Sequence, residues 1–242
     1  MSPRNLSSIE EWIGPIKAKG YLLIMAYRII QRGNNRIACF YSESDYRFYL
    51  EWLFDYAEHC QYQVHAYVLM TNHVHLFVTP ETRSGLGELM KRLGQRYVQY
   101  INRTYQRTGT LWEGRFKSCI TQDDQYVLSC YRYIELNPVR ANIVSHPAEY
   151  AWSSYRSNAQ GECVQALRPH VLYLALGNTA EARQSTYREL FRYHLEPDII
   201  DDIRQSTNGN YALGSERFKK QIEDILGRRV RPGVNGRPKR NQ

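Results

Sequence analysis

Two short segments of the chain carry side chains whose types and spacing suit the cleavage of a phosphodiester. His73 and His75 alternate with Val74 in the run HVHLFV, and residues two apart on a strand share one face. Tyr133 and Asn137 are four apart in YRYIELNPV and share one face of a helix. Imidazoles and a carboxamide oxygen can hold a divalent cation that polarises a phosphate, and a tyrosine hydroxyl can attack phosphorus. These residues are therefore a candidate metal site and a candidate nucleophile.

Each motif also has an ordinary structural explanation. An HxH pair occurs by chance on many strands, and most of the 20 tyrosines must be packing residues. His65 lies on the preceding β-rich run, where it is either a supporting group of a metal site or a hydrogen-bonded core histidine. A third ligand from elsewhere in the chain would raise the HxH pair above chance, and Asn137 is the candidate. A set of two imidazoles and one amide binds a cation loosely and leaves room for water and a phosphate oxygen.

The flanking patterns predict strands that present the histidines on one face. The run YLLIMAYRIIQRGNN predicts a buried strand that ends at the turn signal Gly33-Asn34. The runs QVHAYVLM and HVHLFVTP predict a hairpin that turns at Thr71-Asn72, with the two histidines on its second strand. On that strand the aliphatic side chains point one way, and the histidines with Phe77 point the other way. We expect the aliphatic face to pack on helices and the histidines to face a cleft.

Apolar periodicity predicts helices between these strands. One helix extends to about residue 60 after a cap at Ser44 or Asp45, and another spans about 85–107. The run TLWEGRFKSCITQ predicts a further strand. The helix after it must end near Asn137, because Pro138 disfavours helical geometry in the residue before it. The order β-α-β-β-α-β-α predicts an α+β domain whose antiparallel sheet is covered on one face by helices.

The net charge of +8 is concentrated in two stretches. Residues 82–120 hold eight Lys or Arg against two Glu, and residues 215–242 hold nine against three acidic residues, so each stretch carries +6. A Lys or Arg that neutralises a phosphate releases condensed counterions, so such stretches indicate contact with a polyanion. The alternative is a solvated helix face and a disordered tail. Candidate DNA contacts are Lys91, Arg92, Arg96, Arg103, Arg115, Lys117, Arg228, Arg229 and Arg231, beside Tyr97 and Trp112, on which unpaired bases could stack.

The composition is that of an ordinary globular protein, with 43% hydrophobic and 23% charged residues. No apolar run approaches the roughly 18 residues that a membrane span needs. The start, MSPRNLSSIEEWIG, lacks the apolar stretch of a signal peptide, so we expect a cytoplasmic protein that does not bind membranes. Five scattered cysteines without a CxxC pair are expected to be buried small residues rather than a zinc or redox site.

Four runs, in this order and spacing, resemble the single-tyrosine HUH transposases, where U denotes a hydrophobic residue: VHAYVLMTNHVHLFV, GTLWEGRFKS, YRYIELNPVRANIV and AWSSYRS. Within that group the chain is most similar to the REP-associated tyrosine transposases of bacteria, over roughly residues 20–160. The resemblance implies a ferredoxin-like, RRM-like palm with the HUH strand central in the sheet and the tyrosine on a facing helix. We expect a catalytic domain over residues 1–160, a helical C-terminal extension over 161–227, with helices at 181–205 and 215–227, and a basic disordered tail over 228–242.

The resemblance also implies the chemistry. Tyr133 would be the nucleophile, and His73, His75 and Asn137 would hold Mg²⁺ or Mn²⁺. Related insertion-sequence transposases carry glutamine at the third ligand position, whereas Asn137 matches the REP-associated branch. The family cleaves single-stranded DNA beside imperfect hairpins, leaving a 5′-phosphotyrosine link and a free 3′ hydroxyl. We therefore expect a DNA-cleaving and strand-joining enzyme that acts on single-stranded DNA beside a REP-like hairpin.

Three questions stay open at this point. A replication initiator or relaxase-type nickase shares the chemistry but commonly has additional domains. A hairpin-binding protein without catalysis is the alternative from another class, and the presence of all the ligands and the tyrosine favours the enzyme. We expect a monomer, with a dimer as the alternative.

Overall fold

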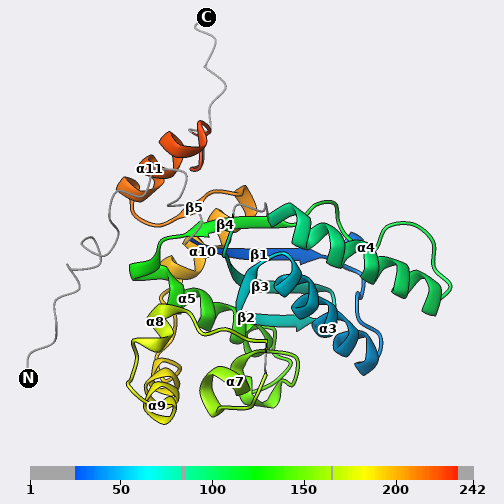
Figure 1. Ribbon diagram of the computed structural model, residues 1–242, viewed down its shortest axis with the longest axis horizontal. Helices are drawn as coiled ribbons and strands as arrows, with labels where there is room; N and C mark the ends of the chain where they lie inside the picture. Colours follow the sequence, from blue (N-terminus) through cyan, green and yellow to red (C-terminus); the bar gives the residue numbers. More distant parts are fainter. Residues whose placement is uncertain (1–24, 83–85, 165, 234–242) are drawn as a thin grey trace, which may run out of the picture.

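The computed structural model describes residues 25–82, 86–164 and 166–233 (Figure 1). Within these residues, five strands form one sheet in the order β2-β3-β1-β4-β5. β3 pairs with β2 and β1, and β1 with β4, all antiparallel, whereas β5 is parallel to β4. The strands are β1 (Ala26–Arg32), β2 (Tyr62–Met70), β3 (His73–Pro80), β4 (Lys117–Thr121) and β5 (Ala212–Leu213).

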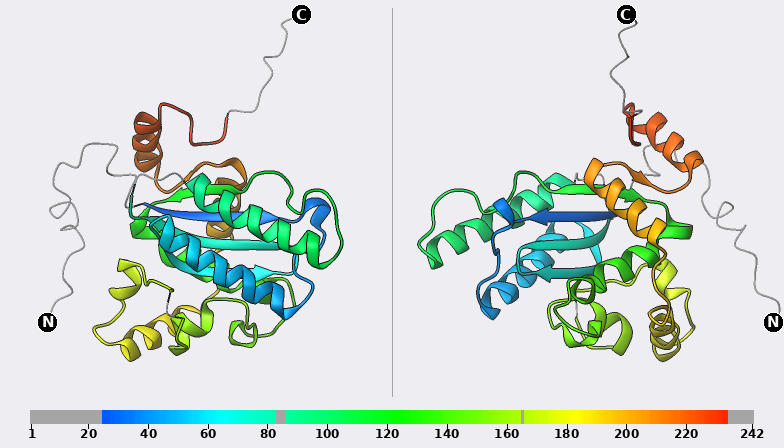
Figure 2. Two further views of the ribbon diagram at one scale, coloured as in Figure 1. Left: turned by 45° about the vertical axis from the view of Figure 1, so that its right-hand side comes forward. Right: turned by 180° about the vertical axis from the view of Figure 1, so that it is seen from behind.

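The first four strands and two helices form the ferredoxin-like palm that was expected. The helices are α3 (Glu43–His59) and α4 (Leu86–Thr104), and the element order is β-α-β-β-α-β. Both helices cover one face of the sheet, and the histidine strand β3 lies in its interior (Figure 2). The α+β class is therefore confirmed. The first four residues of the predicted first strand, 21–24, lie outside the described residues.

A cap residue earlier than predicted starts α3. The helix begins after Ser42, and Ser44 and Asp45 lie inside its first turn. The Asp45 carboxylate accepts a hydrogen bond from the Ser42 backbone N–H at 2.9 Å, which satisfies a donor at the helix start. The same carboxylate accepts hydrogen bonds from Tyr100 and Tyr105, both at 2.8 Å. One buried acid thereby caps α3 and joins it to the end of α4.

The two faces of β3 separate as its alternation predicts. Val74, Leu76 and Val78 are fully buried in a core cluster with residues of α3 and α4. Phe77 belongs to a second cluster on the opposite face, which includes Tyr131 from a third helix. Helices therefore lie on both faces of the sheet, two from the palm on one side and the later helices on the other. This second layer agrees with the facing tyrosine helix that the resemblance implied.

Later elements cover the face that carries the histidines (Figure 2). The predicted strand over TLWEGRFKSCITQ is shorter than expected, since only Lys117–Thr121 is extended in the sheet. The helix expected over 181–205 is two helices, because Pro197 begins a new one at its first position. The helices after β4 are α5 (Asp123–Glu135), α6 (Asn137–Arg140), α7 (Tyr155–Gln160), α8 (Val171–Leu174), α9 (Ala180–Leu190), α10 (Pro197–Gly209) and α11 (Glu216–Leu226), with short 3-10 turns at Asn34–Arg36 and Pro147–Glu149.

The start of the expected basic tail is packed rather than free. Val230 is buried, and its carbonyl accepts a hydrogen bond from the Ala212 N–H at 2.9 Å, beside β5. Arg231 forms ion pairs with Glu216 and Glu223 of α11. The rest of that tail, residues 234–242, lies outside the described residues. The division into three domains remains a prediction.

Two further expectations concern membranes and cysteines. In the part of the chain that the structure describes, no helix is both long enough and apolar enough to cross a membrane. Four of the five cysteines are buried and free, as expected, whereas Cys163 is exposed.

A buried glutamate anchors α5 to the helices beyond it. The Glu135 side chain is completely buried, and its Oε1 accepts hydrogen bonds from Ser154 at 2.6 Å and from Asn158 at 2.8 Å. Its Oε2 accepts one from Tyr187 at 2.7 Å. Burial raises the pKa of Glu135 to about 7, although the three hydrogen bonds act in the opposite direction. The position of α5 therefore depends on a polar cluster shared with α7 and α9.

Candidate active site

The predicted chemical residues meet in one cavity of about 280 Å³ between β3 and α5. The rings of His73 and His75 are 4.9 Å apart and nearly perpendicular, at 82°. The His75 and Tyr133 rings are 6.1 Å apart, at 85°. Asn137 lines the same cavity from the start of α6. The structure thus brings together all four residues that the sequence singled out, while their chemical roles remain a prediction.

The break between α5 and α6 places Asn137 beside Tyr133. Pro138 has no N–H to continue the α-helical hydrogen bonds, and α5 ends at Glu135, two residues earlier than the sequence predicted. Leu136 keeps near-helical geometry, with φ −82° and ψ 0°, so the chain turns only slightly before α6 begins. The carboxamide therefore stays about one turn from the tyrosine, as the four-residue spacing suggested.

Two guanidinium groups lie against the ring of Tyr133. The Cζ of Arg140 is 4.0 Å from the ring centroid, and the Cζ of Arg28 is 4.5 Å from it. Arg28 is only 1% exposed, and it donates hydrogen bonds to Thr207 and, at 3.2 Å, to Nδ1 of His75. Neither partner is acidic. In the described part of the chain, Arg28 Nε and Arg140 Nη1 are buried without a hydrogen-bond partner.

The buried guanidinium of Arg28 and the half-buried one of Arg140 indicate an anion-binding site. Burying a charge without a counter-charge is unfavourable, and a guanidinium matches the geometry of a phosphate through two parallel hydrogen bonds. Arg32 and Arg204 also line the cavity, and none of the described residues lining it is acidic. The arrangement can therefore hold a phosphodiester next to a tyrosine hydroxyl.

Sequence reasoning missed these arginines, although part of the signal was present. Arg28 and Arg32 are four apart in the buried strand β1, so they share the face that carries the histidines of β3. Polar residues repeated on one face of an otherwise apolar strand could have marked them. Arg204, Thr207 and Asn208 come from α10, more than 60 residues after Asn137, and no spacing pattern links them to the motif.

Both imidazoles are held in the neutral form. The pKa of His73 is lowered to about 4, first by burial and then by the charges of Arg32 and Arg28, while a hydrogen bond with Asn137 acts in the opposite direction. Burial, followed by the charge of Arg28, keeps the pKa of His75 well below its ordinary range. Neutral imidazole is the form that binds a metal ion.

The side chains in the cavity offer few ligands to a divalent cation. No group of three His, Cys, Asp or Glu side chains suited to a metal occurs among the described residues, so a cation here depends on the carboxamide of Asn137. His73 fits, because its Nδ1 lies 2.7 Å from Oδ1 of Asn72 and can donate to it, leaving the Nε2 lone pair for a metal. A second group that fixes the ring in this way is typical of histidine ligands.

His75 fits only after a change at Arg28. A guanidinium can only donate, so Nδ1 of His75 accepts the hydrogen bond from Arg28 and the proton of the neutral ring is on Nε2. In that state neither ring nitrogen offers a lone pair to a metal. His75 would be available to a metal only if Arg28 turned to another acceptor, and a phosphate would be such an acceptor.

His65 proves to be a hydrogen-bonded core residue. Its Nδ1 lies 2.6 Å from the carbonyl oxygen of Arg168, and its Nε2 lies 2.8 Å from Oγ1 of Thr79. It does not line the cavity of Tyr133. Of the two explanations that the sequence left open, the structure supports the core role.

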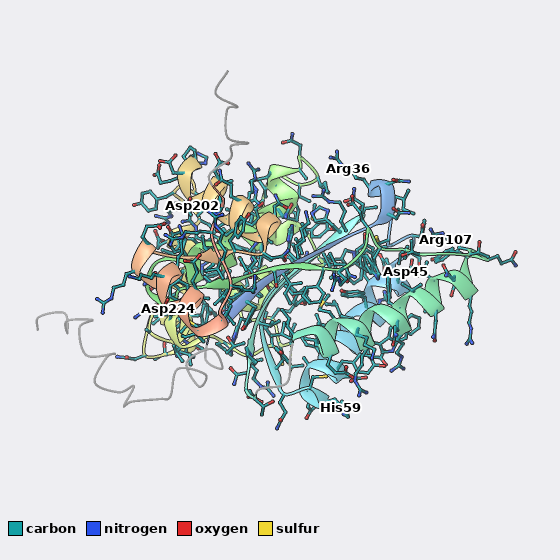
Figure 3. All side chains as sticks on the ribbon, turned by 90° about the horizontal axis from the view of Figure 1, so that it is seen from above. Arg36, Asp45, His59, Arg107, Asp202 and Asp224 are labelled. Atoms are coloured by element: carbon teal, nitrogen blue, oxygen red, sulfur yellow. The ribbon has the colours of Figure 1, made fainter. Side chains whose placement is uncertain are left out.

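The candidate DNA contacts are not gathered at the cavity. Those on α4 belong to the helix that packs on one face of the sheet, whereas Tyr133 packs on the other face. Figure 3 shows Asp202 of α10 on the opposite side of the molecule from Asp45 and Arg107, which lie near the ends of α3 and α4. Arg92 pairs with Glu88, and the guanidinium of Arg96 lies 4.5 Å from the Trp52 ring. The other exposed candidates are Lys91, Arg103, Arg115, Lys117, Arg228 and Arg229.

The two aromatics expected to stack on bases are packed in the core instead. Tyr97 is fully buried and Trp112 is 5% exposed, with their ring centroids 6.0 Å apart. Their faces are therefore covered by protein. Trp112 also lines a second cavity, beside α4.

Comparison with known proteins bears on the family and the fold. Residues 23–137, just under half of the chain, match the family model described as IS200-like transposase. A solved structure of a REP-associated tyrosine transposase bound to a REP hairpin matches with a TM-score of 0.50 and 15% identity, over 61% of this chain and 83% of that one. A provisionally assigned transposase of Deinococcus radiodurans R1 matches with a TM-score of 0.36 and 18% identity, over 51% of this chain and 88% of that one. No curated protein sequence matches significantly. The family model thus supports the resemblance found in the sequence, and the first solved structure supports the fold.

Proposed function

We propose that this chain, which carries an IS200-like transposase domain over residues 23–137, cleaves single-stranded DNA beside a hairpin and rejoins the strands. The observation that carries the proposal is the cavity itself. Tyr133 lies there with two neutral imidazoles, a carboxamide and three arginines, and none of the described lining residues is acidic. That environment favours a phosphodiester and offers it a nucleophile.

Cleavage would proceed by transfer of the phosphate to the tyrosine. The oxygen of Tyr133 forms a bond to phosphorus, the bond from phosphorus to the 3′ oxygen breaks, and the product is a 5′-phosphotyrosine with a free 3′ hydroxyl. The phenol loses its proton to solvent, and the departing 3′ oxygen takes one up. Rejoining is the same transfer in reverse, with a 3′ hydroxyl as the attacking group.

The residues around Tyr133 would orient the reacting phosphate and stabilise its charge. Arg28 and Arg140 already flank the ring, and each has a buried nitrogen free to donate to a phosphate oxygen. Donors placed before the reaction stabilise the transition state without reorganisation. His73, Asn137 and, once released from Arg28, His75 would hold Mg²⁺ or Mn²⁺. Such a cation, when bound, would act as a Lewis acid on the phosphate.

We propose a hairpin substrate because of a solved structure with a similar fold. The REP-associated tyrosine transposase that shares this fold was solved bound to a REP hairpin. Exposed cations beyond the cavity, including Lys91, Arg115 and Arg228, are the proposed contacts to the DNA backbone. We propose that the protein acts as a monomer.

The test is the formation of a covalent adduct. The protein is incubated with Mg²⁺ and a labelled single-stranded oligonucleotide that contains a hairpin, and the products are separated under denaturing conditions. We expect a labelled band at the mass of protein plus DNA, absent in Tyr133→Phe. Tyr126→Phe is the matched control, because Tyr126 lies two turns earlier on α5 and its hydroxyl donates to Asp202 at 3.2 Å, outside the cavity.

Metal binding is tested separately from cleavage. Titration with Mn²⁺, followed by electron paramagnetic resonance, should show a site that is lost in His73→Ala and retained in Tyr133→Phe. An adduct that persists in Tyr133→Phe would show that the nucleophile is another residue. Tight hairpin binding without any adduct, with Mg²⁺ or Mn²⁺ present, would instead favour a hairpin-binding protein without catalysis.

A further inference from the structure

A second cavity, of about 730 Å³, lies beside α4 on the face of the sheet opposite Tyr133. It is bounded by α4, by Gln31 at the end of β1 and by the loop from Trp112 to Phe116. Gln31 and Arg32 are consecutive on β1, so their side chains point to opposite faces. Arg32 lines the first cavity and Gln31 lines the second. The two cavities therefore meet at the same end of one strand.

The floor of this second cavity carries a donor and an acceptor that have no protein partner. Trp112 is 5% exposed and Gln31 is 8% exposed. Among the described residues, neither the indole N–H of Trp112 nor the Oε1 of Gln31 has a hydrogen-bond partner. A buried polar atom left unpaired is energetically unfavourable, so such atoms are uncommon in native proteins. Both side chains line the cavity, where a ligand could satisfy them.

A glycine in the middle of α4 lies next to these two side chains. A Cβ added at Gly94 would lie 3.8 Å from Nε1 of Trp112 and 4.0 Å from Nε2 of Gln31. Glycine inside a helix is destabilising relative to alanine. A side chain at this buried position would contact the indole N–H and the Gln31 amide, which the glycine leaves uncovered on this side.

The rest of the cavity suits a flat ring with an attached phosphate. Met90, Val98 and Phe116 contribute apolar surface, and the exposed side chains of Lys91 and Arg115 supply positive charge at the rim. An adjacent donor and acceptor in the floor complement the edge of a nucleobase, which presents both kinds of group. The indole is fixed by its packing on Tyr97 and Tyr49, so its N–H direction is fixed before binding.

We infer that this cavity binds one unpaired nucleobase of the strand that is cleaved at Tyr133, and reads its edge through Trp112 and Gln31. The identity of the strand rests on the proposed function. The connection between the cavities rests on the structure. The N–H of Glu113 donates to the carbonyl of Arg32 at 2.8 Å, and Gly33 pairs with Trp112, so the loop that forms the second cavity is held against the end of β1. A strand that leaves the first cavity past Arg32 reaches the second by crossing that end.

The first test uses the four deoxynucleoside monophosphates and does not depend on cleavage. The chain has four tryptophans, and the indole N–H resonance of Trp112 is assigned as the one lost in Trp112→Phe. We expect at least one nucleotide to shift that resonance. In Gly94→Ala its affinity should fall roughly tenfold or more, as for a mismatched base contact. Glu51→Ala is the control, because Glu51 is exposed on α3 and does not line the cavity.

The second test measures base preference during adduct formation. Hairpin oligonucleotides with randomised flanking positions are offered to the wild type and to Gln31→Met, which keeps the side-chain volume and removes the amide. We expect the wild type to prefer one base at one flanking position, and Gln31→Met to lose that preference while still forming the adduct.

The outcomes separate the two proposals. An adduct without base preference, together with an unmoved Trp112 resonance, would overturn the nucleobase cavity and leave the proposed function standing. A nucleotide-dependent shift of Trp112 without any adduct would support the cavity and count against the proposed function. A shift that is equal in Gly94→Ala and in the wild type would show that the nucleotide binds elsewhere, and would also overturn the inference.

Discussion

Replacing the buried Glu135 by glutamine should make the protein more stable at neutral pH and leave its stability almost unchanged in weak acid. Burial raises the pKa of Glu135 from 4.5 to about 7. The folded state therefore holds the proton more tightly than the unfolded state. The stability that this proton contributes is complete below pH 4.5 and is lost as the pH rises toward 7.

The size of the effect follows from the pKa difference. One unit of pKa corresponds to about 1.4 kcal/mol, so the carboxylate costs about 3 kcal/mol of folding stability when it is fully ionised. Glutamine imitates the protonated acid. Its oxygen can accept from Ser154 and Asn158, and its N–H can donate to the Tyr187 oxygen, so the cluster keeps its hydrogen bonds.

Urea unfolding, followed by tryptophan fluorescence at pH 5, 6, 7 and 8, measures this directly. The difference in unfolding free energy between Glu135→Gln and wild type should grow by about 2–3 kcal/mol from pH 5 to pH 8. The pKa values of buried His65 and His170 are lowered, so these residues change the stability with pH in the opposite direction. Both proteins contain them, so their contributions to the unfolding free energy cancel in the difference. Glu51→Gln, an exposed glutamate of α3, is the control and should show no such trend. If Glu135→Gln is less stable than wild type by the same amount at every pH, the carboxylate is ionised in the folded protein and the reasoning fails.

Three further changes test other parts of the structure. Asp45→Ala should cost about 3 kcal/mol in urea unfolding, because it removes the acceptor of a helix cap and of two tyrosine hydroxyls; a loss below about 1 kcal/mol would mean that the cluster contributes little. Gly33→Ala should lower the unfolding free energy by about 1–3 kcal/mol, since its Cβ would lie 2.7 Å from Sγ of Cys39, whereas Gly87→Ala should not destabilise. Arg28→Met should tighten Mn²⁺ binding about tenfold or more without DNA, because it removes a nearby positive charge and frees Nδ1 of His75; weaker Mn²⁺ binding would show that this arginine supports the metal site.

The sequence determined the palm because its patterns are local. Alternation along HVHLFV assigns His73 and His75 to one face of a strand whatever the rest of the chain does, and β3 shows that alternation. The proline after Asn137 ends a helix by a purely local restriction, so the break between α5 and α6 was predictable to within two residues. Predicting that these segments meet in one cavity required the family resemblance in addition to the local sequence pattern.

Helix boundaries were less predictable where more than one residue could begin or end a helix. Ser42 caps α3 in place of Ser44 because the Asp45 side chain also satisfies hydroxyls from α4, a contact across 55 residues or more. The helix expected over 181–205 is divided because Pro197 can start a helix as well as interrupt one. In each case a distant partner or a second use of the same residue determined the boundary.

Tertiary structure alone determined the electrostatics of the site. Arg28 is one of two arginines on the same face of β1, and only the packing of α5 and α10 over that strand places it against Tyr133, His75 and Thr207. Only that packing shows which ring nitrogen of His75 accepts a hydrogen bond from Arg28. The unpaired atoms of Trp112 and Gln31 likewise appear only when α4 and β1 are in place. Periodicity assigns a side chain to a face, but its charge neighbours and hydrogen-bond partners come from segments far away in sequence, and these set what the face can bind.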